Sequence, residues 1–211
     1  MIYIVTHDNS IITPDIEGYK DIKVGKICDY LDEDNINDLN GQISELSAIY
    51  QINKYDDEIK GQVHYRRFFL DENGEILSYK KAKELLNDYD IIVTERYCVG
   101  NGIYQNLRNE IGDVEALDKL YNELIKIEPR FKDYLDTTWF NPRQMFICKK
   151  DLYKKYCDWI FPLILPLVDK IKSEKPRFIA YMIERLLTFW IQTNNLKAIE
   201  LKYNETCEKV W

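Results

Sequence analysis

The fold of this chain is decided by the stretch Glu58-Ile59-Lys60-Gly61-Gln62-Val63-His64-Tyr65-Arg66-Arg67-Phe68-Phe69-Leu70. We predict a strand from Ile59 to Phe69, and residues 64–67 bunch three groups that can carry positive charge where that strand should leave the sheet. Like charges repel at this spacing unless an anion lies nearby. Arginine presents a planar fork of donors that suits phosphate and carboxylate oxygens. The run therefore indicates an anionic partner, which is either a bound ligand or the protein's own carboxylates.

On both sides of this stretch, strand-like and helix-like segments alternate. Further strands are predicted at 1–6, 19–24, 89–94, 146–148 and 197–202. Helices are predicted from Asp34 or Asn35 through residues 41–54, and at 79–86, 114–127, 151–171 and 179–191, with Pro162 and Pro166 kinking or breaking the fourth of these five helices. Residues 71–74 read as a turn, and residues 98–102 as a flexible loop. The pattern favours an α/β fold, as one domain over residues 1–211 with a central sheet and a helical C-terminal part.

Composition and charge exclude several classes of protein. The chain has 211 residues, 45% of them apolar, and a formal net charge of −7, which disfavours a dedicated nucleic-acid binder. Five cysteines lack the paired spacing of a zinc site, and we expect reduced thiols in the cytosol. The longest apolar stretch, residues 159–168, is too short to span a bilayer and contains two prolines, so we expect it in the core.

The carboxyl ends of strands predict where a ligand binds, because open α/β sheets hold ligands beyond those ends. This rule collects residues 6–8, 64–67 and 94–96 at one edge of the sheet. It locates a site without naming a reaction.

Seven segments, in the same order along the chain, carry a resemblance to a known family. They are Ile4–His7, Asp34–Tyr50, Gly61–Phe69, Asp90–Val93, Gln144–Lys150, Tyr156–Pro162 and Arg177–Leu187. Together they resemble the DUF4422 family of bacterial capsular and exopolysaccharide biosynthesis proteins, which look like glycosyltransferases with a GT-A (Rossmann-like) fold and a mixed sheet. Two features depart from the family: residues 101–113 contain no histidine, and Gln144 stands where the family has asparagine.

The resemblance implies that a sugar moves from a nucleotide diphosphate sugar to a saccharide or lipid-linked acceptor in cell-surface polysaccharide biosynthesis. Arg66 and Arg67 would then bind the donor phosphates, or else form scaffold ion pairs. His64 would bind phosphate or orient a hydroxyl, although a histidine at a strand end is often merely hydrogen-bonded structure. Because strand neighbours point to opposite faces, the two arginines share one phosphate only if the strand has already ended.

Further donor-binding residues are expected on the same basis. Thr6 and His7 would lie near the nucleotide, with strand packing as the alternative. Asn35 and Asn40 would contact polar groups of the donor, although helix capping explains one of them equally well. Arg185 completes the expected donor-binding set.

Glu184 is the preferred general base, because a carboxylate in an otherwise apolar helix has its pKa raised by partial burial. Its neighbour Arg185 favours the alternative of a structural ion pair. Glu45, on another predicted helix, is a similar candidate for the general base. Aromatic residues that can stack on a sugar, or belong to the core, are Trp139, Tyr181 and Trp190.

Metal dependence is left open. Many GT-A enzymes hold Mn²⁺ or Mg²⁺ with an Asp-x-Asp motif, and residues 32–34 (Asp-Glu-Asp) match it, although an acidic loop capping a helix explains them better. We expect a cytoplasmic protein, with peripheral contact at the inner face of the membrane where a lipid-linked acceptor would lie. Two alternatives stay open: an inactive sugar-nucleotide-binding or assembly protein of the same fold, and, ranked last, an anion-sensing module.

Overall fold

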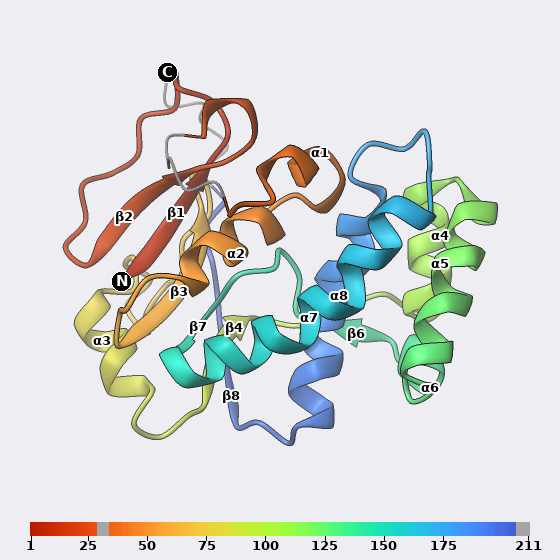
Figure 1. Cartoon of the computed structure of the whole chain (residues 1–211). Coiled ribbons are helices and arrows are strands. Elements are labelled where there is room, and N and C mark those ends of the chain that lie inside the picture. Colours follow the sequence, from red (N-terminus) through yellow and green to blue (C-terminus); the bar gives the residue numbers. More distant parts are fainter. Residues whose placement is uncertain (29–33, 206–211) are drawn as a thin grey trace.

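A six-stranded mixed sheet forms the centre of the protein in this computed structural model, which describes residues 1–28 and 34–205 (Figure 1). The strand order is β2-β1-β3-β7-β4-β8, and only β7 runs antiparallel to its neighbours in this sheet. The strands are β1 (Ile2–Thr6), β2 (Tyr19–Lys23), β3 (Ile59–His64), β4 (Ile91–Thr94), β7 (Phe146–Lys149) and β8 (Ala198–Leu201). The predicted α/β class with a mixed sheet is confirmed.

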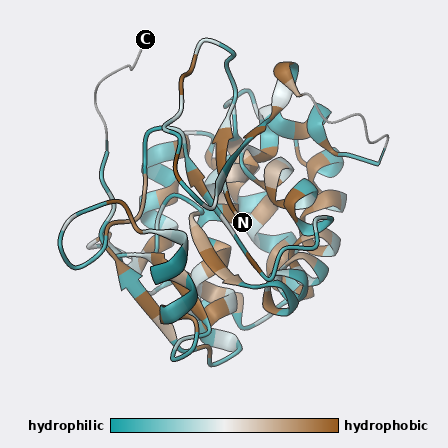
Figure 2. Ribbon diagram, turned by 90° about the vertical axis from the view of Figure 1, so that its left-hand side faces the viewer, coloured by the Kyte–Doolittle hydropathy of each residue, from teal (hydrophilic) through white to brown (hydrophobic). Residues whose placement is uncertain are grey.

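Helices cover both faces of the sheet. The larger core packs α2 (Leu46–Asn53), α7 (Lys150–Lys170) and α8 (Phe178–Thr193) against one face, and α3 (Tyr79–Leu85) packs on the other. Alternation along β4 explains the two cores, since Ile91 and Val93 face the first and Ile92 faces the second. In Figure 2 the helices alternate between hydrophobic and hydrophilic residues, as expected for elements with one buried face.

A helical group lies beyond α8, away from the sheet (Figure 1). It comprises α4 (Ile103–Ile111), α5 (Val114–Ile127) and α6 (Phe131–Leu135), and a two-stranded sheet of β5 (Tyr97–Cys98) and β6 (Trp139–Phe140) leads into and out of it. The prediction of a loop at 98–102 is therefore only partly right, because β5 ends at Cys98. Helix α4 was not predicted.

Three predicted elements differ from those in the structure. The helix expected at 41–54 is interrupted, because Ser44 (φ 50°) separates α1 (Asn40–Ile43) from α2. The strand expected to reach Phe69 stops at His64. Helix α7 runs continuously through Pro162 and Pro166. Two short 3₁₀ turns complete the described elements: Gly25–Ile27 and Asn37–Leu39.

The apolar stretch at 159–168 packs in the larger core, as expected. Among residues 1–28 and 34–205, no helix is both long enough and apolar enough to cross a lipid bilayer.

Candidate functional site

A cavity of about 360 Å³ opens at the carboxyl ends of β1 and β3, a volume typical of small-molecule sites. Residues from the end of β1, segment 40–46, the turn after β3, the turn before β7 and the start of α8 line it. Its histidine, arginine and glutamate lining residues, as far as the structure describes them, are His7, Glu45, His64, Arg66, Arg67, Arg143, Arg177 and Glu184. Four arginines against two glutamates give a local excess of two positive charges (4 − 2) in a chain whose net charge is −7.

The turn after β3 explains how Arg66 and Arg67 come to line the same cavity. Strand β3 ends at His64, and the Arg67 N–H donates to the His64 carbonyl at 3.0 Å, which closes a tight turn. Once the strand has ended, neighbouring side chains no longer alternate between two faces. Arg66 is exposed and lies over the Tyr65 ring, with 5.6 Å from its guanidinium carbon to the ring centroid.

Arg67 is only 8% exposed and contacts two groups of the protein. Its Nη2 pairs with the Glu205 carboxylate, and its Nη1 lies 3.3 Å from His64 Nδ1. Since arginine only donates, Nδ1 accepts, and the proton of a neutral His64 imidazole resides on Nε2. Arg67 therefore pairs internally, one of the two expected readings, while it also lines the cavity.

His64 has a lowered pKa, chiefly because it is buried, with a further contribution from the Arg67 charge. Glu45 acts in the opposite direction, since its Oε1 lies 3.7 Å from His64 Nε2. Burial prevails, so we treat His64 as neutral at pH 7.

The 141–144 turn, which precedes β7, brings Arg143 and Gln144 to the cavity. Because β7 is antiparallel, its first residues lie at the edge where β1 and β3 end. Neither residue was predicted as a site residue, although Gln144 was noted as a departure from the family, because only the carboxyl ends of strands were considered. Residues 94–96 lie at the carboxyl end of β4, which runs parallel to β1 and β3, so they lie at the predicted edge of the sheet. They do not line the described cavity: Thr94 Oγ1 donates to the Pro142 carbonyl at 2.7 Å, and Arg96 Nη2 pairs with Glu200 at 2.8 Å.

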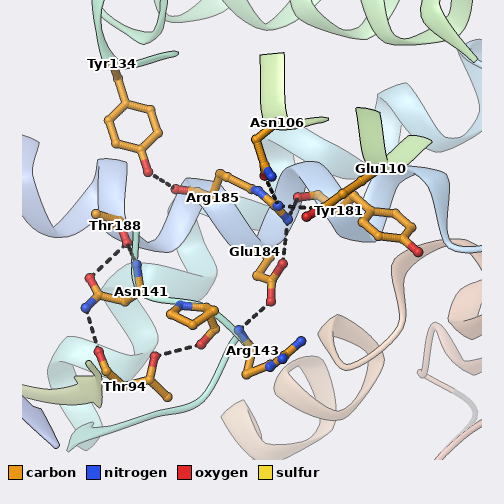
Figure 3. A network of polar contacts seen from close by, with 11 residues as sticks. Thr94, Asn106, Glu110, Tyr134, Asn141, Arg143, Tyr181, Glu184, Arg185 and Thr188 are labelled. Atoms are coloured by element: carbon orange, nitrogen blue, oxygen red, sulfur yellow. Dashed lines mark hydrogen bonds and ion pairs between the residues drawn. The ribbon is translucent and has the colours of Figure 1, made fainter. Parts of the chain in front are cut away.

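Asn141 anchors this turn to two other elements (Figure 3). Its Nδ2 donates to the Thr94 carbonyl at 2.7 Å, and its backbone N–H donates to Thr188 Oγ1 at 2.8 Å. The Thr188 hydroxyl donates back to Asn141 Oδ1 at 3.0 Å. The turn is thus tied to the end of β4 and to α8.

Glu184 lies where α8 meets the 141–144 turn and lines the cavity (Figure 3). Its Oε1 accepts the backbone N–H of Arg143, and its Oε2 accepts Nη1 of Arg185. Burial raises the pKa of Glu184, and the charge of Arg185 opposes that shift without cancelling it. The carboxylate is therefore fixed in position and more basic than an exposed glutamate.

Arg185, expected to bind the donor, points away from the cavity. It is 1% exposed, and its Nη2 donates to Asn106 Oδ1 and Glu110 Oε2, both at 2.8 Å (Figure 3). Its guanidinium carbon also lies 4.2 Å from the centroid of the Phe140 ring. These contacts place Arg185 in the internal network that was its alternative reading.

The other predicted donor-binding residues divide into two pairs. His7 and Asn40 line the cavity, whereas the described lining excludes Thr6 and Asn35. Thr6 is a buried residue of β1. Asn35 Oδ1 accepts the backbone N–H of Asn37 at 3.0 Å, a local bond of the capping kind.

Of the three aromatic candidates, only Tyr181 lines the cavity. Trp190 packs in the core against Tyr156, with ring centroids 5.1 Å apart, and Trp139 lies beneath the Arg96 guanidinium. Arg177, the residue before the first turn of α8, also lines the cavity but was not predicted as a site residue.

No group of three or more His, Cys, Asp or Glu side chains suited to a metal ion occurs within residues 1–28 and 34–205. Asp32 and Glu33 of the Asp-x-Asp run lie outside the described residues. Asp34 Oδ1 accepts the Tyr50 hydroxyl at 2.7 Å, and its Oδ2 pairs with Lys54 at 3.1 Å. The described residues thus do not by themselves make a metal site, and we derive no step through a metal.

Comparison with known proteins gives two matches. The family described as Domain of unknown function (DUF4422) matches residues 1–195. A solved structure titled "WbbM bifunctional glycosytransferase apo structure" superposes with a TM-score of 0.77 at 23% sequence identity, over 98% of this chain and 45% of that one. The chain therefore spans less than half of the length of that relative, with which it shares a fold. No curated protein matches.

Proposed function

The chain belongs to the DUF4422 family, and we propose that it is a glycosyltransferase that moves a sugar from a nucleoside diphosphate sugar to a hydroxyl of a saccharide or lipid-linked acceptor in cell-surface polysaccharide assembly. One observation carries the proposal: a single cavity combines arginines from two turns with the half-buried carboxylate of Glu184. The likeness to a protein titled a bifunctional glycosyltransferase supports the same reaction class.

Arginine side chains in the cavity suit the leaving group. A nucleoside diphosphate gains negative charge as the bond to the sugar breaks, and fixed cationic donors stabilise that charge. Arg66 and Arg67 from the turn after β3, with Arg143 from the 141–144 turn, are the groups that we assign to this role. His64 Nε2, which carries the proton of the neutral ring, is a further donor in the same lining.

Glu184 is the group that we assign as general base. Its raised pKa brings it closer to the pH at which it would accept a proton from the acceptor hydroxyl. Each oxygen already accepts one hydrogen bond, but a carboxylate offers about four lone-pair sites, so it can accept another from the acceptor. Arg185 acts on this base as a positioning residue through its bond to Oε2.

Donor binding and turnover are tested separately. Thermal shift and calorimetry against UDP-, GDP-, CMP- and dTDP-sugars identify the donor. Arg66→Ala or Arg67→Ala then weakens donor binding about 10- to 100-fold, because a charge-assisted hydrogen bond contributes ~1.5–3 kcal/mol. Arg108→Ala, an exposed arginine outside the described cavity lining, is the control and leaves binding unchanged. Absence of stabilisation by any nucleotide sugar contradicts the proposal.

Turnover is tested with Glu184→Gln. We expect a loss of about 10²–10⁴ in kcat with donor affinity kept, since general-base catalysis contributes that much. The matched control is Glu110→Gln, because Glu110 also bonds Arg185 but is not part of the described lining. Donor hydrolysis or transfer to lipid-linked or oligosaccharide acceptors is the readout, with and without Mn²⁺, Mg²⁺ or EDTA. Donor binding without any turnover would instead favour the inactive sugar-nucleotide-binding protein.

A further inference from the structure

Some of the buried polar atoms without a hydrogen-bond partner belong to residues that line the cavity. Within the described part of the chain, they include Arg67 Nε, His64 Nε2, Arg143 Nε and Gln144 Oε1, all on lining residues. Folded proteins keep few such atoms, since each has lost water and gained nothing in return. A bound molecule that carries both donors and acceptors would supply the missing partners.

Gln144 is the member of this group whose orientation the protein fixes most firmly. It is 4% exposed, and its Nε2 donates to the Tyr156 hydroxyl at 2.6 Å. Its backbone carbonyl accepts Nε2 of Gln62, also at 2.6 Å. With one amide atom held by Tyr156, the carbonyl oxygen Oε1 is left as an acceptor with no partner among the described residues.

The backbone at Gln144 is strained. Arg143 has a φ of 76° and Gln144 a φ of 53°, two successive non-glycine residues in the left-handed region. Such strain persists only where surrounding contacts over-determine the conformation, and it is concentrated at functional sites. Here Asn141, Tyr156 and Gln62 supply those contacts.

The position of Gln144 indicates which part of a ligand it meets. It directly follows Arg143, which lines the cavity and whose backbone N–H holds Glu184. In the proposed reaction the transferred sugar lies between the diphosphate and the hydroxyl that the base deprotonates. A residue that adjoins both groups is therefore placed beside the sugar.

We propose that Gln144 is a specificity-determining residue whose Oε1 accepts a hydrogen bond from one hydroxyl of the donor sugar; this inference rests on the proposed function. A neutral amide oxygen suits a hydroxyl and repels the carboxylate of an acidic sugar at the same place. The unpartnered Nε–H groups of Arg67 and Arg143 can donate to oxygens of the same donor.

The test compares each nucleoside diphosphate with its sugar conjugate by calorimetry. UDP, GDP and dTDP are titrated beside UDP-glucose, UDP-galactose, GDP-mannose and dTDP-glucose, and the best-binding pair is used. In Gln144→Met, which keeps length but cannot accept, we expect the sugar conjugate to bind about tenfold more weakly, since one hydrogen bond is lost. The affinity for the bare diphosphate stays unchanged.

Gln51→Met is the matched control. Gln51 is also 4% exposed with an unpartnered Oε1, but it is not part of the described lining, so both affinities stay at the wild-type level. A second measurement needs only the folded wild-type protein: among deoxy analogues of the donor sugar, one binds about tenfold more weakly. For that analogue, Gln144→Met causes no further loss, because the same bond is absent.

The possible results distinguish failure of the proposed role of Gln144 from failure of the proposed glycosyltransferase function. If no diphosphate or sugar conjugate binds wild type, the proposed function fails and the inference falls with it. If the conjugate binds, and Gln144→Met weakens both ligands equally or neither, the glycosyltransferase proposal stands and the inference is overturned.

Discussion

Replacing Asn141 with alanine tests whether the 141–144 turn depends on its anchor. The change removes the donor to the Thr94 carbonyl (2.7 Å) and the acceptor of the Thr188 hydroxyl (3.0 Å). Each such bond contributes ~1 kcal/mol, and leaving a buried carbonyl unpartnered adds ~1–2 kcal/mol. Since Thr94 is fully buried, we expect the free energy of unfolding to fall by about 3 kcal/mol.

Urea denaturation followed by circular dichroism measures this loss. Thr188→Val removes the hydroxyl that bonds Asn141 twice, and it costs about 2 kcal/mol. Because the two side chains share a bond, the double variant loses about 1 kcal/mol less than the sum of the single losses. Asn109→Ala, at an exposed position, is the control and stays within about 0.5 kcal/mol of wild type.

The Asn141 variant also bears on the proposed chemistry. If the turn loosens, the Arg143 N–H no longer holds Glu184 Oε1. A donor to the ionised form lowers a pKa, so its loss raises the pKa of Glu184 further. The limb of the pH–rate profile that reports the base then moves to higher pH. Strict additivity in the cycle, or a loss below about 1 kcal/mol for Asn141→Ala, would refute the anchor.

Two further predictions concern His64 and Glu205, two side chains that contact Arg67. The pKa of His64 is lowered in the folded protein, so the unfolded chain binds the His64 proton more tightly than the folded protein does. The His64 contribution to the free energy of unfolding is therefore fully present above the ordinary pKa of about 6.5, and it is lost as the pH falls below that value. Urea titrations from pH 8 to pH 5 should show this slope in wild type and His7→Gln but a smaller one in His64→Gln, and equal slopes would contradict it. Glu205→Gln removes the carboxylate paired with Arg67, so calorimetry with inorganic pyrophosphate should show several-fold tighter binding. Stability should change by less than about 1 kcal/mol, because the Glu205 side chain is 44% exposed; weaker binding would refute the competition.

The fold was largely predictable because buried segments carry their own periodicity. Helix α5 followed from its apolar spacing, and β1 from an unbroken apolar run. Helix α4 was missed because Ile103, Leu107 and Ile111 are its only buried residues, one per turn among polar neighbours. Gly102 and Gly112, both with positive φ, bound that helix and were the available signal. Local sequence thus identifies elements with a broad apolar face better than elements held by a narrow one.

The site was predictable only where it follows a strand. His7, Arg66 and Arg67 were found because the chain leaves the sheet there, and parallel strands end at one edge. Arg143 and Gln144 precede their strand, so finding them required the knowledge that β7 is antiparallel. That orientation is set by pairing with distant β3 and β4, which local sequence does not encode.

Helix geometry explains why the side chains of Glu184 and Arg185 lie in different places. Neighbours on a helix point about 100° apart, so Glu184 lines the cavity while Arg185 turns toward α4. The two residues are adjacent in sequence, which suggested one shared role, but their roles differ: Glu184 lines the cavity, and Arg185 lies behind it.

The pairing of Arg67 with Glu205 gives an electrostatic reason for a cationic cavity in an acidic chain. A buried arginine without a counter-ion carries a large desolvation cost. Glu205 offsets that cost, and as a partly exposed side chain it can leave into water when another anion arrives. A diphosphate would then exchange one anion for another rather than bind a bare cation, so affinity reflects only the difference between the two pairings. This exchange favours moderate affinity for the donor and release of the product diphosphate. We therefore expect Glu205→Gln to bind the diphosphate more tightly and to release it more slowly.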